Sequence, residues 1–139
     1  MTKPTPATAT REITALSALD LSRAIHDRKL SCTEVMTACL DQIEALNPAV
    51  NAIVSLRPRA VLMIEAATAD ADLAAGRSRG WLHGIPQAPK DLTATAGIAT
   101  TFGYRGLHDS QPHADSILVE RLRGAGAILW LVVLIPLAT

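Results

Sequence analysis

Residues 80–103 read GWLHGIPQAPKDLTATAGIATTFG, and this stretch decides how the rest of the chain is interpreted. It holds the only dense cluster of Gly, Pro, His, Lys and Asp, whereas the preceding segments are rich in Ala and other helix-forming residues. Glycine and proline interrupt regular structure, so Gly84 and Pro86 indicate turns that shape the entry to a strand. The single lysine of the stretch, Lys90, is therefore the first candidate for chemistry.

The composition of the 139 residues is typical of one globular domain with a buried core. Hydrophobic residues make up 49% and charged residues 19%, which excludes an intrinsically disordered chain. The formal net charge is zero and no basic stripe is present, so a nucleic-acid interface is not expected. Aromatic residues account for only 3%, which removes the stacking platforms that bind single-stranded nucleic acid.

Four segments have the apolar spacing of amphipathic helices. They are residues 16–29, 32–46, about 58 or 59 to 75, and 114–124. Ser17 or Asp20 could cap the first of them. Ser31 and Glu34 form a capping box before the second, which Asn47-Pro48 is expected to end because a residue before proline avoids helical geometry. Gly76 suits the end of the third helix, and Asp115 is the expected N-cap of the fourth.

The segments outside these helices are short or irregular. Residues 1–12, rich in Thr, Pro and Ala, are expected to form a disordered N-terminal tail, followed by one domain over residues 13–139. Residues 51–56 could be a strand or a lead-in turn. The apolar residues 127–137 are best interpreted as a strand over 127–134 that is buried on both faces. A membrane-spanning helix is not expected, because about 20 apolar residues are needed and Pro136 interrupts the run. An exposed apolar end would promote aggregation.

The two cysteines, Cys32 and Cys39, fall on one expected helix. Seven residues of helical rise separate their α-carbons by about 10 Å, too far for a disulfide. We interpret them as small buried apolar residues in a reducing, cytoplasmic setting, with no metal site implied.

The motif Leu-His-Gly-Ile-Pro at 82–86, followed by Lys90-Asp91, then Gly-Ile at 97–98 and Thr-Thr at 100–101, resembles the amidase signature family. The flanks agree, with Asn-Pro at 47–48 after a capped helix and Leu-Arg-Gly-Ala-Gly-Ala at 122–127. The resemblance extends from residue 16 to residue 129, and several fixed residue types recur at fixed spacings. It therefore covers most of the chain.

The resemblance implies an α/β fold, of which this chain would be the N-terminal part, with helices packed on an incomplete mixed sheet. It implies hydrolysis of small carboxylic amides through a Ser–Ser–Lys triad, without metal or organic cofactor. The triad lysine corresponds to Lys90. A lysine in a dry pocket loses affinity for its proton, so its neutral amine can take a proton from a hydroxyl and activate that nucleophile.

The other polar residues of the chain are expected to have structural roles. His83 is interpreted as structural rather than as a base, and Asp91 as a residue that caps or orients its neighbours. His26 is expected on a solvated helix face. Asp70 and Asp72 are expected to be solvated, because two residues of helical spacing point their carboxylates in different directions.

Two departures from the family pattern bear on activity. Gln87, Ala88 and Pro89 replace small β-branched or Ala residues before Lys90, and proline removes a backbone donor from what should be an interior strand. After residue 129 the family continues with a Gly-Lys-Thr-Asn turn, whereas here Trp130 opens a divergent apolar tail over 130–139.

The residues after Lys90 contain two serines, Ser110 and Ser116, neither in a Gly-Ser-Ser-Gly setting. The serine partners of Lys90 are therefore absent from this chain, which is expected to be inactive alone. The alternative interpretation is an interaction module, or one half of a split amidase, that self-associates or docks through exposed apolar surface.

Overall fold

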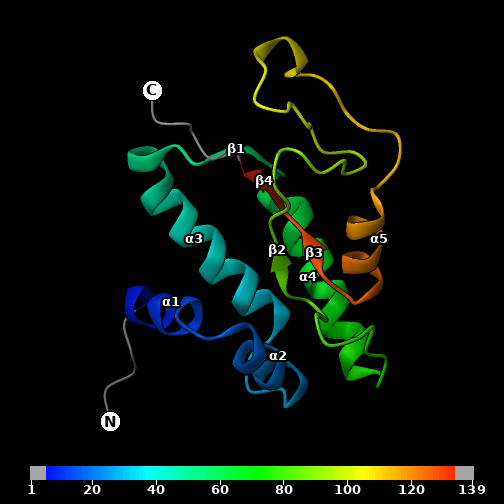
Figure 1. The fold of residues 1–139 in the computed structure, drawn as a ribbon. Helices are drawn as coiled ribbons and strands as arrows, with labels where there is room; N and C mark the ends of the chain where they lie inside the picture. Colours follow the sequence, from blue (N-terminus) through cyan, green and yellow to red (C-terminus); the bar gives the residue numbers. More distant parts are fainter. Residues whose placement is uncertain (1–5, 134–139) are drawn as a thin grey trace.

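The computed structural model describes residues 6–133, in which helices alternate with short strands. The elements are α1 (Pro6–Thr14), α2 (Ala18–His26), α3 (Cys32–Val50), β1 (Ile53–Leu56), α4 (Arg59–Ala74), β2 (Pro86–Gln87), the 3₁₀ helix η1 (Arg105–Leu107), α5 (Ile117–Gly124), β3 (Ile128–Leu129) and β4 (Leu131–Val133). Figure 1 shows the strands in the middle of the molecule, between α3 and α5, with α4 behind them. The result is the expected α/β fold.

The strands form two ladders that meet at Trp130. β2 pairs with β3 in parallel, and β1 pairs with β4 in antiparallel fashion. Trp130 lies between β3 and β4: its N–H donates to the carbonyl of Gln87 at 3.3 Å, and its carbonyl accepts from the N–H of Arg57 at 3.0 Å. The strands together therefore make the small mixed sheet that the sequence predicts.

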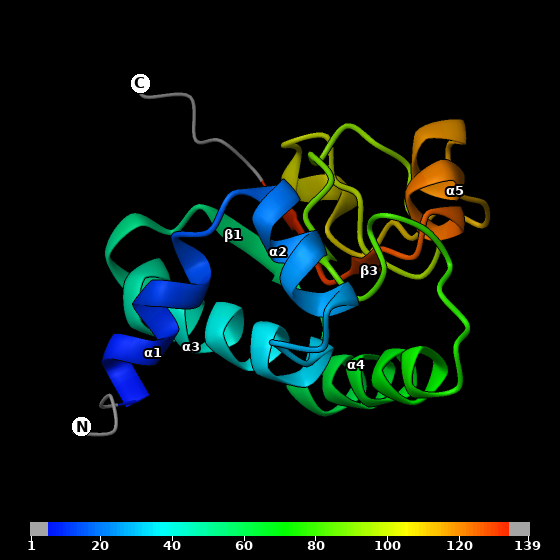
Figure 2. The ribbon, with the colours of Figure 1, turned by 90° about the horizontal axis from the view of Figure 1, so that it is seen from below.

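Helices α3 and α4 supply most of the core beneath this sheet, as Figure 2 shows from below. The fully buried apolar side chains come from α2, α3, α4, α5 and β3, and the largest are Ile25, Val35, Met36, Leu40, Leu62, Val119 and Leu129. Alternating burial along α3 and α4 follows the apolar spacing read from the sequence. The core is thus built mainly from segments that come before the central stretch.

The helix starts were predicted well where a local side chain decides them. Ser17 caps α2, accepting from the N–H of Asp20 at 3.1 Å. Ser31 and Glu34 form the expected capping box at the start of α3. The third expected helix is α4, which ends at Ala74, with Gly76 in a left-handed conformation two residues later.

Helix α3 continues one turn beyond its expected end, to Val50, with Pro48 inside that last turn. The final turn closes with a bond from the N–H of Asn51 to the carbonyl of Asn47, and Asn51 adopts a left-handed conformation. The Asn47 amide also exchanges two hydrogen bonds with the backbone of Ile53. These bonds to β1 hold the last turn, so the preference of a pre-proline residue for extended geometry is overridden.

Three further expectations differ from the structure. Helix α1 occupies residues that were expected to belong to the disordered tail. The last helix begins at Ile117 with Ser116 as its cap, because the Asp115 side chain is bonded elsewhere. The expected strand over 127–134 is interrupted at Trp130, and residues 134–139 of the apolar tail lie outside the described residues.

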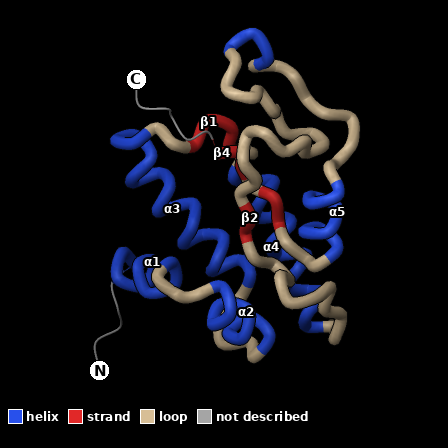
Figure 3. Tube along the Cα trace, viewed as in Figure 1, coloured by secondary structure: helices blue, strands red, loops and turns tan. Residues whose placement is uncertain are grey.

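Between β2 and α5 the chain runs for almost thirty residues as a loop whose only helical segment is η1, as Figure 3 shows. This segment carries Lys90 and Asp91. Across residues 6–133, no helix combines the length and the apolar character needed to span a lipid bilayer.

Candidate active site around Lys90

Lys90 lies three residues beyond the end of β2, at the start of the long loop. Its carbonyl accepts the N–H groups of Leu92 at 2.7 Å and Thr93 at 2.9 Å, which turns the chain sharply after the lysine. The Lys90 side chain is exposed. The dry pocket expected around it is therefore not formed by the described residues.

The two residues expected to disturb this segment are accommodated. Strand β2 ends at Gln87, so the missing N–H of the buried Pro89 falls outside the ladder with β3. Gln87 is half-buried, and its carbonyl remains paired with Trp130. Pro89 was expected within an interior strand, and this expectation was wrong because the strand is shorter than the pattern indicates.

Asp91 is the anchor of the loop beside Lys90. Its carboxylate is 1% exposed and accepts the N–H of Thr101 at 2.6 Å, the hydroxyl of Thr101, and the N–H of Gly103 at 3.1 Å. Burial by itself raises the pKa of this carboxyl, but these bonds, with a contribution from the N–H of Phe102, hold the pKa below its ordinary value. Asp91 thus orients its neighbours, as the sequence predicts.

A second carboxylate, Asp115, fixes the other end of the loop. One oxygen accepts the N–H of Ala96 at 2.7 Å, and the other accepts Nε of Arg123 at 2.7 Å. Ser116 donates its N–H to the carbonyl of Ala94, so the loop is fastened to the start of α5. Sequence reasoning assigned Asp115 to helix capping because its partner on the loop lies nineteen residues away.

His83 is buried and neutral in its hydrogen bonding. The N–H of Arg79 donates to Nδ1 at 3.1 Å, so the proton resides on Nε2, which donates to the carbonyl of Ala69 at 2.9 Å. Both ring nitrogens are therefore occupied in joining the Gly-rich turn to α4. The structural interpretation of His83 is supported by this geometry.

The Gly-rich turn fits closely against neighbouring elements. Gly84 has φ of +73°, and a methyl group there would collide with the Cβ and Sγ atoms of Cys32. Cys32 is fully buried, and its pKa is raised to about 12 by burial and by the nearby Asp70 carboxylate. Burial also raises the pKa of Cys39 to about 11. Both cysteines are free, as expected.

Asp70 and Asp72 are not simply solvated, contrary to expectation. The Asp70 carboxylate accepts the N–H groups of Cys32 at 2.6 Å and Thr33 at 3.1 Å, at the start of α3. Asp72 accepts Arg77 at 2.8 Å and Arg79 at 3.1 Å. The partners of Asp70 lie almost forty residues away, so local spacing carried no signal of them.

The serines after Lys90 serve the backbone. Ser116 caps α5, with its hydroxyl accepting the N–H of Val119 at 3.4 Å. The carbonyl of Ser110 accepts the N–H of Thr100 at 2.9 Å. Within residues 6–133, no group of three His, Cys, Asp or Glu side chains is arranged to hold a metal ion.

Comparison with known proteins identifies the family. The family described as Amidase matches residues 34–131, which include β2, Lys90, Asp91 and β3. This chain belongs to the amidase family. An acylamidase from Rhodococcus erythropolis is 37% identical over 113 residues, and a glutamyl-tRNA(Gln) amidotransferase from Azoarcus sp. is 42% identical over 112 residues; each alignment covers 81% of this chain.

Solved structures of amidases agree with the fold. The native peptide amidase from Stenotrophomonas maltophilia matches 86% of this chain with a TM-score of 0.77 and 34% identity. A fatty acid amide hydrolase matches 92% of it with a TM-score of 0.83 and 25% identity. The amidase chain described here spans about a quarter of the length of these relatives: 24% of the acylamidase and 22% of the fatty acid amide hydrolase.

Proposed function

We propose that Lys90 is the triad lysine of an amidase-signature site that acts on small carboxylic amides. One observation carries this proposal: Lys90 follows the parallel strand β2 inside the region matched to the amidase family, and Asp91 beside it is locked to Thr101 and Gly103. The backbone at Lys90 is thus fixed even though its side chain is exposed. The proposed chemistry uses no metal and no organic cofactor.

In this proposal a neutral Lys90 amine accepts a proton from a serine hydroxyl, and that serine attacks the amide carbon. The resulting acyl-enzyme is then hydrolysed by water. Ser110 and Ser116 do not supply the nucleophile, since Ser116 is used as a helix cap and neither lies in a Gly-Ser-Ser-Gly sequence. These 139 residues therefore provide the lysine side of the site, and alone they do not hydrolyse amides.

The names of the relatives support the amide substrate class without selecting one member. They include an acylamidase, a peptide amidase and an amidotransferase, which share a carboxylic amide as the reacting group. We propose the same class here. The buried cysteines and the relatives fit a cytoplasmic location, which subcellular fractionation would test.

The inactivity of the chain alone can be measured directly. The purified 139-residue chain would be incubated with simple aliphatic and aryl amides, and ammonia or amine release would be followed. The proposal predicts a rate equal to that of buffer, for the chain and for Lys90→Ala alike. A rate above buffer that disappears in Lys90→Ala would overturn it.

A second candidate function is that of a docking module, which would act as one half of a split amidase. The observation that favours it is the number of large apolar side chains at the surface. Those more than half exposed are Leu19, Leu46, Val50, Ile64, Trp81, Leu92, Phe102, Tyr104, Ile117 and Leu118. They lie on α2, α3, α4, α5 and the long loop, so several faces of the molecule could receive a partner.

Size-exclusion chromatography with light scattering tests the docking function. Self-association, or a stable complex with the remaining part of an amidase expressed as a separate chain, would support it. A monomer that binds no apolar dye and forms no such complex would count against it.

A further inference from the structure

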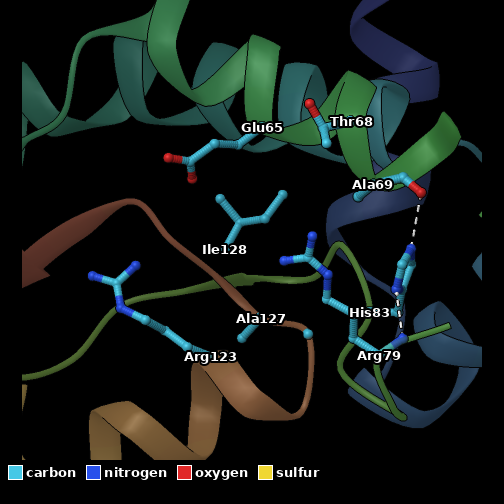
Figure 4. A pocket seen from close by; sticks show the side chains of 9 residues that line it. Glu65, Thr68, Ala69, Arg79, His83, Arg123, Ala127 and Ile128 are labelled. Atoms are coloured by element: carbon cyan, nitrogen blue, oxygen red, sulfur yellow. Dashed lines mark hydrogen bonds between the residues drawn. The ribbon is translucent and has the colours of Figure 1, made fainter. Parts of the chain in front are cut away.

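A cleft of about 310 Å³ lies between α4, the turn that precedes β2, and the start of β3. Its lining includes Glu65, Thr68, Arg79, His83, Arg123 and Ile128, shown in Figure 4. Lys90 is not part of this lining, so the cleft is separate from the proposed amidase site. Three elements distant in sequence contribute polar side chains to it.

Two arginines enter the cleft from different elements. Arg79 comes from the loop after α4 and Arg123 from the last turn of α5. Each is held on one side only: Nη2 of Arg79 donates to Asp72 at 3.1 Å, and Nε of Arg123 donates to Asp115 at 2.7 Å. Within residues 6–133 their other guanidinium N–H groups make no hydrogen bond, so both arginines are oriented yet retain free donors.

The charges around the cleft leave a positive excess. Glu65 is neutralised by a two-point bond with Arg57, at 2.5 and 3.1 Å, and Asp115 balances Arg123. Asp72, in contrast, is shared by Arg77 and Arg79, so one carboxylate faces two guanidinium groups. The unbalanced positive charge lies at the Arg79 side of the cleft.

The remaining polar groups do not offset this excess. His83 is engaged at both ring nitrogens, with Arg79 and with Ala69, and so adds no free acceptor. The hydroxyl of Thr68 donates to the carbonyl of Ile64 at 2.8 Å. The floor is apolar, formed in part by Ala127 and Ile128, and weakens the competition of water for a bound charge.

We propose that this cleft binds a small oxyanion, a carboxylate or a phosphate, between Arg79 and Arg123. The planar fork of a guanidinium group presents paired donors that match the oxygens of both anions. The site goes beyond the proposed amidase function and does not depend on it.

The test is a titration of the ¹⁵N-labelled 139-residue chain, observing the arginine Nε–Hε signals in NMR spectra. Inorganic phosphate is added in one series and acetate in another, with sodium chloride keeping the ionic strength constant. The proposal predicts saturable shifts of the Arg79 and Arg123 signals in at least one series. The anion that saturates at the lower concentration identifies the preferred class. No saturable shift in either series would overturn the proposal.

Matched variants separate a built site from general electrostatic attraction. Arg79→Gln removes the cleft arginine, while Arg77→Gln removes the other arginine that shares Asp72 but lies outside the lining. We expect Arg79→Gln to weaken binding roughly tenfold and Arg77→Gln by less than about twofold. Equal weakening by both would overturn the proposal.

Two further variants guard against a folding defect. Arg79→Lys keeps the charge but loses the fork, and should also weaken binding several-fold. Arg123→Gln tests the opposite wall independently. Backbone amide spectra report whether each variant is folded, and unchanged binding in a folded Arg123→Gln would overturn the two-arginine site.

Discussion

At the scale of single residues, the carboxylate of Asp91 joins the start of the long loop to Thr101 and Gly103. Asp91→Asn keeps the size of the side chain but removes its charge. We expect a loss of about 1–3 kcal/mol in the free energy of unfolding at neutral pH, because the buried N–H donors lose a charged acceptor. Urea denaturation followed by circular dichroism measures this loss.

The same substitution has a predicted pH dependence. The folded pKa of Asp91 is lowered, so its stabilising contribution is complete above the ordinary carboxyl pKa of about 3.9 and is lost as pH falls through the lowered folded value. The stability difference between wild type and Asp91→Asn should therefore be constant near neutral pH and shrink under strongly acidic conditions. A difference that grows on acidification would contradict the assignment.

Gly84 offers a second test with a matched control. Gly84→Ala places a methyl group against Cys32 and also demands a left-handed conformation, with φ of +73°. Gly97 has φ of +76°, but a methyl group there meets nothing within 4 Å. We expect Gly97→Ala to cost about 1–2 kcal/mol, from the backbone alone, and Gly84→Ala at least about 1 kcal/mol more. Equal losses in thermal denaturation would show that the turn is not closely packed.

The thiols provide a chemical measurement at the same scale. With pKa values raised to about 12 for Cys32 and about 11 for Cys39, neither forms much thiolate near neutral pH. We expect both to react with a disulfide reagent far more slowly in the native chain than in urea. Rapid labelling of the native chain would contradict the burial of Cys32.

Sequence reasoning succeeded at residues whose partners are close along the chain. Ser31 and Glu34 show this, since the capping box is complete within four residues. It failed at Asp70 and Asp115, whose partners come from other elements and are brought near only by the packing of α4 and the loop. The environment of Lys90 was missed for the same reason: it depends on tertiary contacts.

At the scale of elements, Arg57 connects β1, α4 and β3. Its guanidinium bonds Glu65 through two nitrogens and the carbonyl of Leu129 at 2.6 Å, and its side chain is only 20% exposed. Local sequence carries no signal of this link, because a lone arginine before a proline resembles any surface residue.

Arg57→Gln should therefore destabilise the chain by about 1.5–3 kcal/mol, since it leaves Glu65 and a strand carbonyl without their charged donor. Arg59 is the control, because it bonds Asp41 and Glu44 with its side chain 40% exposed. Arg59→Gln should cost less than about 1 kcal/mol. Comparison of denaturation midpoints distinguishes the two, and the reverse order would contradict the role assigned to Arg57.

At the same scale, the number and order of the helices after residue 16 followed from apolar spacing, but their ends did not. Pro48 was expected to stop α3, yet bonds between Asn47 and β1 support one more turn. The strand expected over 127–134 is divided at Trp130, which pairs with β2 on one side and with Arg57 on the other. Strand boundaries depend on the neighbouring strands, which no local pattern records.

At the scale of the whole molecule, the chain is an N-terminal amidase region with a good core and apolar surface on several helices. Ile117 is 71% exposed and Ile64 is 68% exposed. Such side chains favour association, because burying them removes apolar area from water. We expect Ile64→Lys together with Ile117→Lys to reduce dye binding and self-association without lowering the melting temperature appreciably. A large loss of stability would show that these side chains already pack in the monomer.

The central claim is that Lys90 is the catalytic lysine, and grafting it into an active relative tests this most directly. Residues up to Leu129 of this chain would replace the matching segment of the Rhodococcus erythropolis acylamidase, which supplies the rest of the amidase chain. We predict that the folded graft hydrolyses the acylamidase's amide substrate, and that Lys90→Ala lowers kcat by roughly 10²–10⁴-fold while Lys29→Ala leaves it unchanged. A folded graft whose activity is the same with and without Lys90 would contradict the assignment of Lys90.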